Sequence, residues 1–219
     1  MAGRPPLRPT AGTGDADDLA RLDAAARHPS MLARVVAGVF TPANVVLAVM
    51  AYVALRHSSS AVEAFGWWAL TLVLVVGVPY GILFRALRVG RVDDRQVVRR
   101  SQRPWLFVMA LVCVAVALGV LAVAGAPREV VVLVVAMAAG LVAMSVVTLV
   151  TKASMHLAVA SGAVAVVLVE QPGVGAALAL LLVPIGWARW RDGRHSVGQL
   201  VLGAVIGGVA SWVVYGVLR

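Results

Sequence analysis

The chain has 219 residues, of which 61% are hydrophobic and only 13% are charged, with a mean hydropathy of +0.93. A soluble domain is nearer half apolar and a quarter charged, so this composition excludes a soluble globular protein and predicts a single membrane domain. The net charge is +9, but the basic residues lie in short loops between apolar runs, which argues against a nucleic-acid partner.

The first thirty residues differ from the rest of the chain. Residues 1–14 are rich in Pro, Gly and Arg and contain no apolar run, so residues 1–30 are expected to form a disordered polar tail. Asp15–Arg27 has the pattern of a short amphipathic surface helix with acids at its start. The first apolar run comes too late for a secretory signal peptide, so residues 31–219 are expected to form the membrane domain.

The remaining sequence predicts an all-α, polytopic transmembrane bundle of about six to seven spans. A helix needs about 20 mostly apolar residues to cross a bilayer, and the apolar runs are separated by polar breaks with Pro, Gly or charge. The fifth and sixth runs are short and lie beside polar clusters. The predicted spans are Leu32–Leu55, Ala64–Leu87, Pro104–Gly125, Val130–Val150, His156–Val169, Val174–Ala188 and Val197–Leu218.

Three further patterns predict packing rather than chemistry. Gly203 and Gly207 form a small-xxx-small pattern that allows a neighbouring backbone to approach closely. Trp67, Trp68 and Trp105 lie near predicted span ends, which is typical of an interfacial aromatic belt. The lone cysteine, Cys113, lies in an apolar run and is interpreted as a small buried hydrophobe.

Loop charges predict the topology. With seven spans, 16 of the 19 basic residues fall on one side, including those of Arg85–Arg103, Lys152 and Arg189–Arg194. The opposite side carries Arg56, Arg128 and Arg219, balanced by three glutamates. The positive-inside rule therefore places the N-terminus and the basic loops at the cytoplasmic face of the cell membrane.

Two polar clusters adjoin the short spans and are the strongest candidates for a site. Arg189 and His195 lie between the last two spans, and Lys152 and His156 flank the start of the fifth. Ionisable residues at the edge of a bilayer are costly, so they usually face a cavity and have a function. Fixed positive charge beside two histidines is the composition of a phosphate site.

These clusters resemble motifs of the phosphatidic acid phosphatase type 2 superfamily, which includes membrane lipid phosphatases and haloperoxidases. The third motif matches best: Arg189, five residues and His195, with Ala188 replacing the family's serine and Gln199 its acid. The second motif is represented by Ala153-Ser154-Met155-His156. The first retains Arg103-Pro104, with Gln96 at the lysine position and Arg95 beside it. The resemblance extends from Arg95 to Trp212 and is that of a divergent, actinobacterial-like member.

The resemblance implies an integral membrane phosphatase that hydrolyses a lipid or isoprenoid phosphate through a phosphohistidine. In that reading His195 is the nucleophile, Gln199 orients it through Nδ1, and His156 is the general acid. The implied phosphate ligands are Arg189, Lys152, Ser154, Arg103 and Arg95. Such a site requires no metal and no other cofactor. The expected partners are the bilayer and the phosphorylated lipid, and further copies of the chain are left open.

Other interpretations remain at this point. Each polar residue has a structural alternative, such as helix capping for His195 or snorkelling for Lys152. Arg191 and Arg194 are interpreted as topological charges. The departures from the motifs also allow a bundle that binds phosphorylated lipids without hydrolysing them. Asp93 and Asp94 are the candidates for a magnesium–diphosphate site, which prenyl transfer or cyclisation would need.

Overall fold

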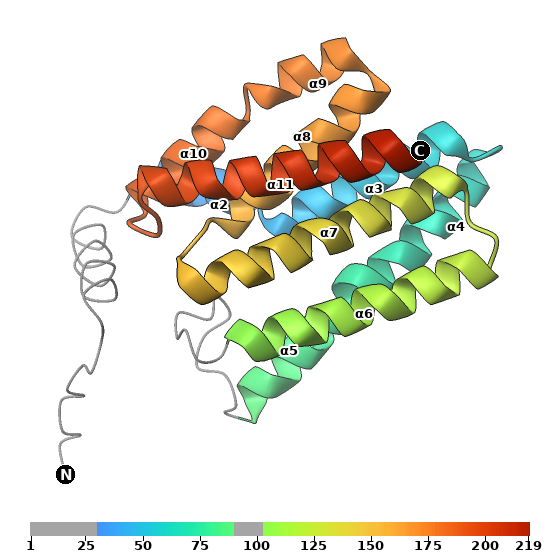
Figure 1. Ribbon diagram of the computed structural model, residues 1–219, viewed down its shortest axis with the longest axis horizontal. Helices are drawn as coiled ribbons and strands as arrows, with labels where there is room; N and C mark the ends of the chain where they lie inside the picture. Colours follow the sequence, from blue (N-terminus) through green and yellow to red (C-terminus); the bar gives the residue numbers. More distant parts are fainter. Residues whose placement is uncertain (1–29, 90–102) are drawn as a thin grey trace.

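The computed structural model describes residues 30–89 and 103–219, and all regular structure in these two ranges is helical (Figure 1). Five helices are long and apolar enough to cross a membrane, and a bent pair raises the number to six. The chain is therefore an all-α, multi-pass membrane protein, as its composition predicts. The predicted tail, Arg95, the Asp93–Asp94 pair and the Arg103 side chain lie outside the described part.

The helix bounds follow the predicted apolar runs closely. In chain order the helices are α2 (Met31–Val39), α3 (Pro42–His57), α4 (Ala61–Leu72), the π-helical turn η1 (Val73–Gly77), α5 (Val78–Arg88), α6 (Arg103–Val123), α7 (Arg128–Val150), α8 (Met155–Glu170), α9 (Pro172–Ala179), α10 (Leu182–Arg191) and α11 (Val197–Leu218).

The first predicted span, Leu32–Leu55, is not one straight helix, although its two parts together remain a candidate span. It divides into α2 and α3, which meet at 41°. The Thr41 hydroxyl accepts from the Asn44 N–H at 3.2 Å and Pro42 opens α3, so a new helix begins here. Asn44 Nδ2 donates to the Val39 carbonyl at 2.9 Å, which satisfies the end of α2.

The second and sixth spans are also irregular. In the second, the Val78 N–H donates to the Val73 carbonyl five residues back, and Pro79 supplies no N–H, which explains the π turn. In the sixth, Leu180 and Leu181 donate to carbonyls three residues back, so the helix tightens and breaks between α9 and α10. Each remains one candidate span, Ala61–Arg88 and Pro172–Arg191.

Helix α8 is the centre of the bundle and packs most extensively on α11, with α3, α7, α9 and α10 around it. The predicted packing role of Gly203 and Gly207 is confirmed. A Cβ added at Gly207 would overlap the Ala158 carbonyl, and one added at Gly203 would overlap that of Ser154. The backbones of α8 and α11 are therefore in direct contact over two turns.

Two of the three tryptophans near predicted span ends make hydrogen bonds within the protein, and the interfacial belt stays a prediction. The Trp67 indole N–H donates to Glu63 Oε1 at 3.1 Å, and the Trp68 indole N–H donates to the Leu47 carbonyl of α3 at 3.1 Å. Both rings pack into the protein, whereas Trp105 is exposed. Cys113 is buried, as predicted.

Figure 1 shows the two ends of the bundle clearly. At one end, here called the basic end, lie the loops Thr151–Ser154 and Asp192–Ser196, the end of α5 and the start of α6. At the other, the far end, lie the α3–α4, α6–α7 and α8–α9 junctions and the C-terminus. The predicted convergence of basic loops on one face is confirmed for their described parts.

Candidate functional site

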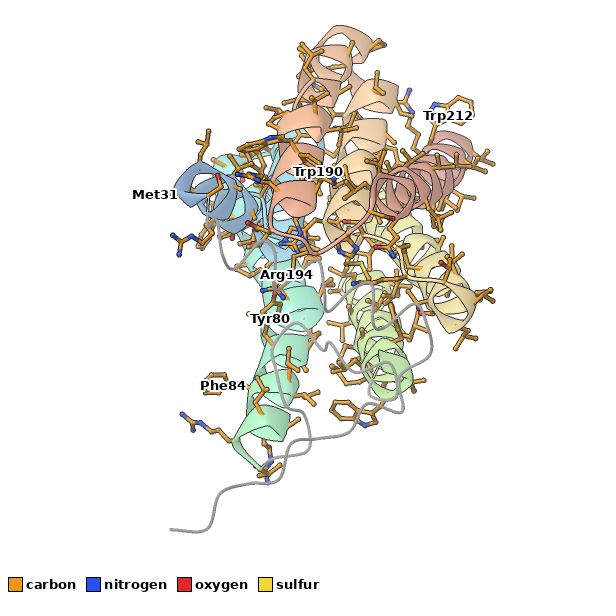
Figure 2. The ribbon with its side chains drawn as sticks, turned by 90° about the vertical axis from the view of Figure 1, so that its left-hand side faces the viewer. Met31, Tyr80, Phe84, Trp190, Arg194 and Trp212 are labelled. Carbon is orange, nitrogen blue, oxygen red and sulfur yellow. The ribbon has the colours of Figure 1, made fainter. Side chains whose placement is uncertain are left out.

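The basic end is viewed face-on in Figure 2, where Arg194 lies near the centre and Met31, Trp190 and Trp212 point outward. The polar residues at this end come from three elements: the start of α8, the end of α10, and the loop before α11. Each is positioned by ordinary backbone capping.

Ser154 positions the start of α8. Its N–H donates to the Gln199 carbonyl at 3.0 Å, its hydroxyl accepts from the Leu157 N–H at 3.5 Å, and the residue is 0% exposed. The serine is thus enclosed between α8 and α11, and the predicted phosphate contact from its hydroxyl and N–H is not supported. The N–H groups of Met155 and His156 remain at the open first turn, where a helix has no internal acceptors.

Arg189 is buried, with 5% of the residue exposed. Its neighbour Ala188 packs on Ala33 and Ala37 of α2, so α10 is held against α2 at this level. The nearest acid is Asp192, whose Oδ2 lies 3.9 Å from Arg189 Nη1, which is too far for a hydrogen bond. Nε is buried and has no hydrogen-bond partner within the described part of the chain. An incompletely paired buried guanidinium is the main requirement for binding an anion.

The turn after α10 brings His195 back towards Arg189. Gly193 has a positive φ of 66°, and the Arg194 N–H donates to the Arg189 carbonyl at 3.2 Å, which closes the turn. Ser196 then caps α11: its hydroxyl accepts from the Gln199 N–H at 3.4 Å, and Gln199 Oε1 accepts from the Ser196 N–H at 3.1 Å.

That capping box corrects the role assigned to Gln199. The amide oxygen is bonded to the Ser196 N–H, and His195 Nδ1 is buried without a partner among the described residues. The Gln199 side chain still interacts with the His195 ring and opposes the lowering of its pKa, but Nδ1 itself has no hydrogen bond within the described part. Gln199 is four residues after His195 and three after Ser196, so the same position serves a histidine contact and an N-terminal capping box.

His195 is the electrostatic centre of the site. Burial lowers its pKa, and the positive charges of Arg189 and Lys152 lower it further, as does His156, while Gln199 opposes the shift. These groups act on one imidazole, so the structure brings His195, His156, Arg189, Lys152 and Gln199 together. The ring is consequently neutral at physiological pH, which is the form that has a free lone pair.

Arg194 belongs to the same cluster, although the sequence was interpreted as giving it only a topological role. Its charge acts on both His156 and Arg189. The available signal was its position directly before His195, in a turn that must return to Arg189. Arg191, in contrast, is exposed. Within the described ranges no group of three metal-binding side chains occurs.

The far end contains a second polar cluster that the sequence reading missed. The Glu170 side chain is 3% exposed and accepts from Arg56, His57, Tyr215 and Arg219 at 2.9–3.3 Å. His57 Nδ1 also lies 3.5 Å from Glu129. The network joins α3, α7, α8 and α11. The sequence does show acidic and basic residues at the ends of four separate spans on the predicted non-cytoplasmic side. Which of them pair with one another depends on the helix arrangement.

Comparison of the chain with protein-family models, with curated proteins and with solved structures gives no match. The function is therefore argued from the geometry of the site.

Proposed function

We propose that this protein is an integral membrane phosphatase that hydrolyses a lipid or isoprenoid phosphate at the basic end of its bundle. The observation that carries the proposal is the placement of a neutral, buried His195 among Arg189, Lys152 and His156, with part of the arginine unpaired. Fixed cations stabilise the charge that develops on a transferred phosphoryl group, and a neutral imidazole is a competent nucleophile. The motif resemblance points to the same reaction.

The proposed reaction has two steps. In the first, His195 Nε2 forms a bond to phosphorus, the bond from phosphorus to the lipid oxygen breaks, and the departing alkoxide takes a proton from His156. The negative charge of the bound phosphate keeps His156 protonated against its burial and the charges of Arg189 and Arg194. In the second, His156 accepts a proton from water, the water oxygen bonds to phosphorus, and the bond from phosphorus to Nε2 breaks. Arg189 and Lys152 hold the phosphoryl oxygens throughout. Arg194 adds a further positive charge to the site.

The membrane setting defines the substrate and its side. A site at the end of an apolar bundle takes a headgroup whose hydrocarbon part remains in the bilayer. The loop charges place this end at the cytoplasmic face of the cell membrane, so the proposed substrate belongs to the cytoplasmic leaflet.

A second function is favoured by one observation. Because Gln199 Oε1 caps α11 and His195 Nδ1 has no partner in the described part, the imidazole lacks the carboxylate that would stabilise its charged form. A phosphoenzyme at His195 would be correspondingly less stable. The same cation cluster would still bind a phosphorylated lipid, so binding without turnover is the alternative.

One experiment separates the two functions. The purified protein in micelles is given a panel of lipid and prenyl phosphates, with and without chelator, and both phosphate release and ligand binding are measured. We expect chelator-insensitive release that His195→Ala abolishes and Arg189→Ala reduces, while the control Arg191→Ala, on an exposed cation, retains it. Binding that Arg189→Ala abolishes, with no release by the native protein, would establish the alternative. Absence of both would refute the site.

A further inference from the structure

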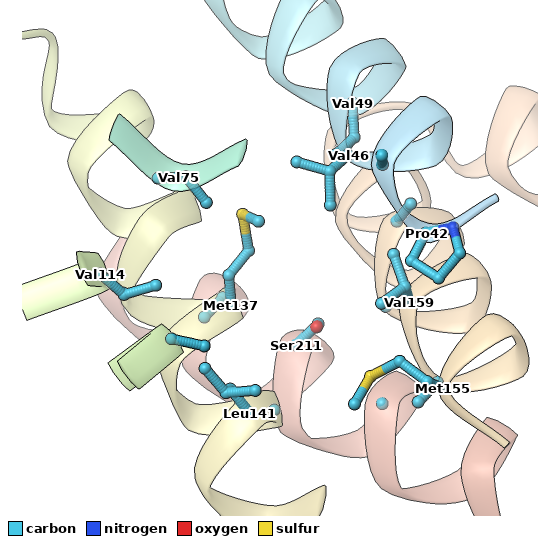
Figure 3. Close-up of a pocket in the computed structure, with 18 of the residues that line it drawn as sticks. Pro42, Val46, Val49, Val75, Val114, Met137, Leu141, Met155, Val159 and Ser211 are labelled. Carbon is cyan, nitrogen blue, oxygen red and sulfur yellow. The ribbon is translucent and has the colours of Figure 1, made fainter. Parts of the chain in front are cut away.

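Two apolar hollows lie inside the bundle, and only one shares its helix faces with the polar cluster. The central cavity, about 220 Å³, lies between α3, η1, α7, α8 and α11 and includes Val75, Met137, Met155 and Ser211 (Figure 3). The α3–α8–α10 groove, about 370 Å³, is lined by Phe40, Ala48 and Tyr52, by Ala160 and Val164 of α8, and by Leu182 and Ile185 of α10. Val49 and Ala163 contribute to both and separate them.

On α8, His156 lies on the face that lines the groove. It precedes Ala160 by four residues, and residues four apart are stacked on one face of a helix. Met155, one residue earlier, lines the central cavity instead. Because α8 begins at the basic end, and side chains lean towards the start of their helix, His156 leans towards that end.

On α10, Arg189 lies on the groove face by the same reasoning. It follows Ile185 by four residues, and Ile185 lines the groove and packs with Ala160 and Phe40. Helix α10 ends at the basic end, so the Arg189 side chain leans back along the helix towards the groove. This direction agrees with its burial at 5% exposure. The two residues proposed to act on phosphate therefore lie one helical turn beyond the groove residues Ala160 and Ile185, on the same helix faces.

The groove follows α8 for about two helical turns. From Ala160 to Val167, the α8 residues that line it, the helix rises about 10 Å, and His156 lies about 6 Å further towards the basic end, so that the two together are roughly half the thickness of the hydrocarbon core. Tyr52 lines the deep end, and its hydroxyl donates to Gln171 Oε1 at 3.3 Å, joining α3 to the α8–α9 junction. Both helix breaks, at Phe40 and at Leu181, also line this groove.

We propose that the α3–α8–α10 groove holds one hydrocarbon chain of the phosphorylated lipid, with the phosphate at His156, Arg189 and His195. The inference rests on the proposed phosphate site. The groove is apolar like the chain, the positive charge that a phosphate requires lies one helical turn beyond its Ala160–Ile185 end, and the distance from His156 to its far end is that of one leaflet. A linear acyl or alkyl chain and a branched isoprenoid share this chemistry.

Two matched substitutions test the assignment. Ala48→Phe places a ring in the groove, and Gly140→Phe places the same ring in the central cavity, where a Cβ at Gly140 meets nothing within 4 Å. Each variant is assayed for phosphate release from dodecyl phosphate, farnesyl phosphate and ethyl phosphate. We expect Ala48→Phe to lower kcat/KM about tenfold for the long chains, with ethyl phosphate unchanged and Gly140→Phe without effect on any of them. If the native protein hydrolyses dodecyl phosphate faster than farnesyl phosphate, the natural chain is linear, and if it prefers farnesyl phosphate, the natural chain is an isoprenoid.

A binding measurement keeps this inference separate from turnover. A dodecyl phosphate with a diazirine at its chain end is photo-crosslinked to the native protein, and the labelled peptides are identified. Label on residues 44–52, 160–167 or 178–185 supports the groove even if no phosphate is released, which would refute only the hydrolytic function. Label on residues 133–144, or a chain-selective loss in Gly140→Phe, overturns the assignment. Equal loss of long and short substrates in Ala48→Phe also overturns it.

Discussion

Replacing Gln199 by Glu should raise the pKa of His195 and improve it as a nucleophilic centre. Glutamate has the same shape and retains the acceptor that the Ser196 N–H uses at 3.1 Å, so the capping box survives. A negative charge in the first turn of α11 also suits the helix dipole. The substitution therefore adds one charge beside the imidazole and changes little else.

The size of the effect follows from the position of the charge. His195 directly precedes the α11 cap and position 199 lies in the first turn of α11, so a carboxylate there lies on the order of 6 Å from the ring. At an effective dielectric constant of about 20, opposite charges at this distance attract by about 3 kcal/mol, which is about 2 pKa units. Burial and the Arg189 and Lys152 charges lower the pKa of His195 in the native protein, so the added charge opposes them directly.

The assay is an NMR titration of His195 in micelles, together with the pH dependence of phosphate release. The protonated form should persist to higher pH in Gln199→Glu, and kcat should rise because the carboxylate stabilises the positively charged imidazole. Val197→Glu is the control, since Val197 lies in the same turn but is 62% exposed, where solvent screens an added charge. Equal shifts of the His195 pKa in both variants, or no shift in either, would refute the conclusion that nearby charges control the protonation of His195.

Three further predictions concern packing, the far end and sidedness. Gly207→Ala should destabilise the protein by about 1–3 kcal/mol, because the new Cβ overlaps Ala158, whereas Gly119→Ala, in open space on α6, should leave the stability unchanged. The unfolding temperatures of both variants are measured in detergent, and equal stability would contradict the α8–α11 contact. Glu170→Gln should lower the free energy of unfolding by about 1–2 kcal/mol, a value that is small because solvent screens the half-exposed Arg56 and Arg219. The loss should exceed that in Glu129→Gln, and an unchanged unfolding temperature would show that the network contributes nothing. In Arg194→Cys, the new cysteine should be labelled in intact cells only by membrane-permeant reagents, whereas the cysteine of Arg219→Cys should react with impermeant reagents. The reverse labelling pattern would invert the topology and move the substrate to the outer leaflet.

The spans were predictable from the sequence because apolar run length directly reports a membrane crossing. The ends of α7, α8 and α11 fall within two residues of the predicted bounds. The breaks at Phe40 and Leu180 were not predicted, since they interrupt apolar runs without a charged residue. Thr41 and Asn44 do mark the first break, as a cap and a side chain that satisfies the preceding helix, but only in three dimensions is their pairing evident.

The residues of the candidate site were predictable from the sequence, but their hydrogen bonds were not. Spacing and topology were sufficient to bring His156, Arg189 and His195 to one end. They were insufficient for Gln199, which lies four residues after His195 and three after Ser196 and so fits a histidine contact and a capping box equally. Nor did they predict the enclosure of Ser154, which depends on the close approach of α11 at Gly203. The Glu170 network was likewise beyond sequence reasoning, because its direct contacts join residues up to 114 positions apart only through helix packing.

The contact between α8 and α11 has a mechanical consequence. His156 begins one of these helices and His195 directly precedes the cap of the other, so backbone contact makes the two imidazoles part of one rigid body. Arg189 is tied to the same unit at its end, because the Arg194 N–H donates to its carbonyl in the turn that precedes His195, although α10 also packs on α2, which is bent away from α3. A change in bilayer thickness that tilts α2 or α10 would thus reach the site through this one turn, whereas a tilt of α8 and α11 carries both histidines together.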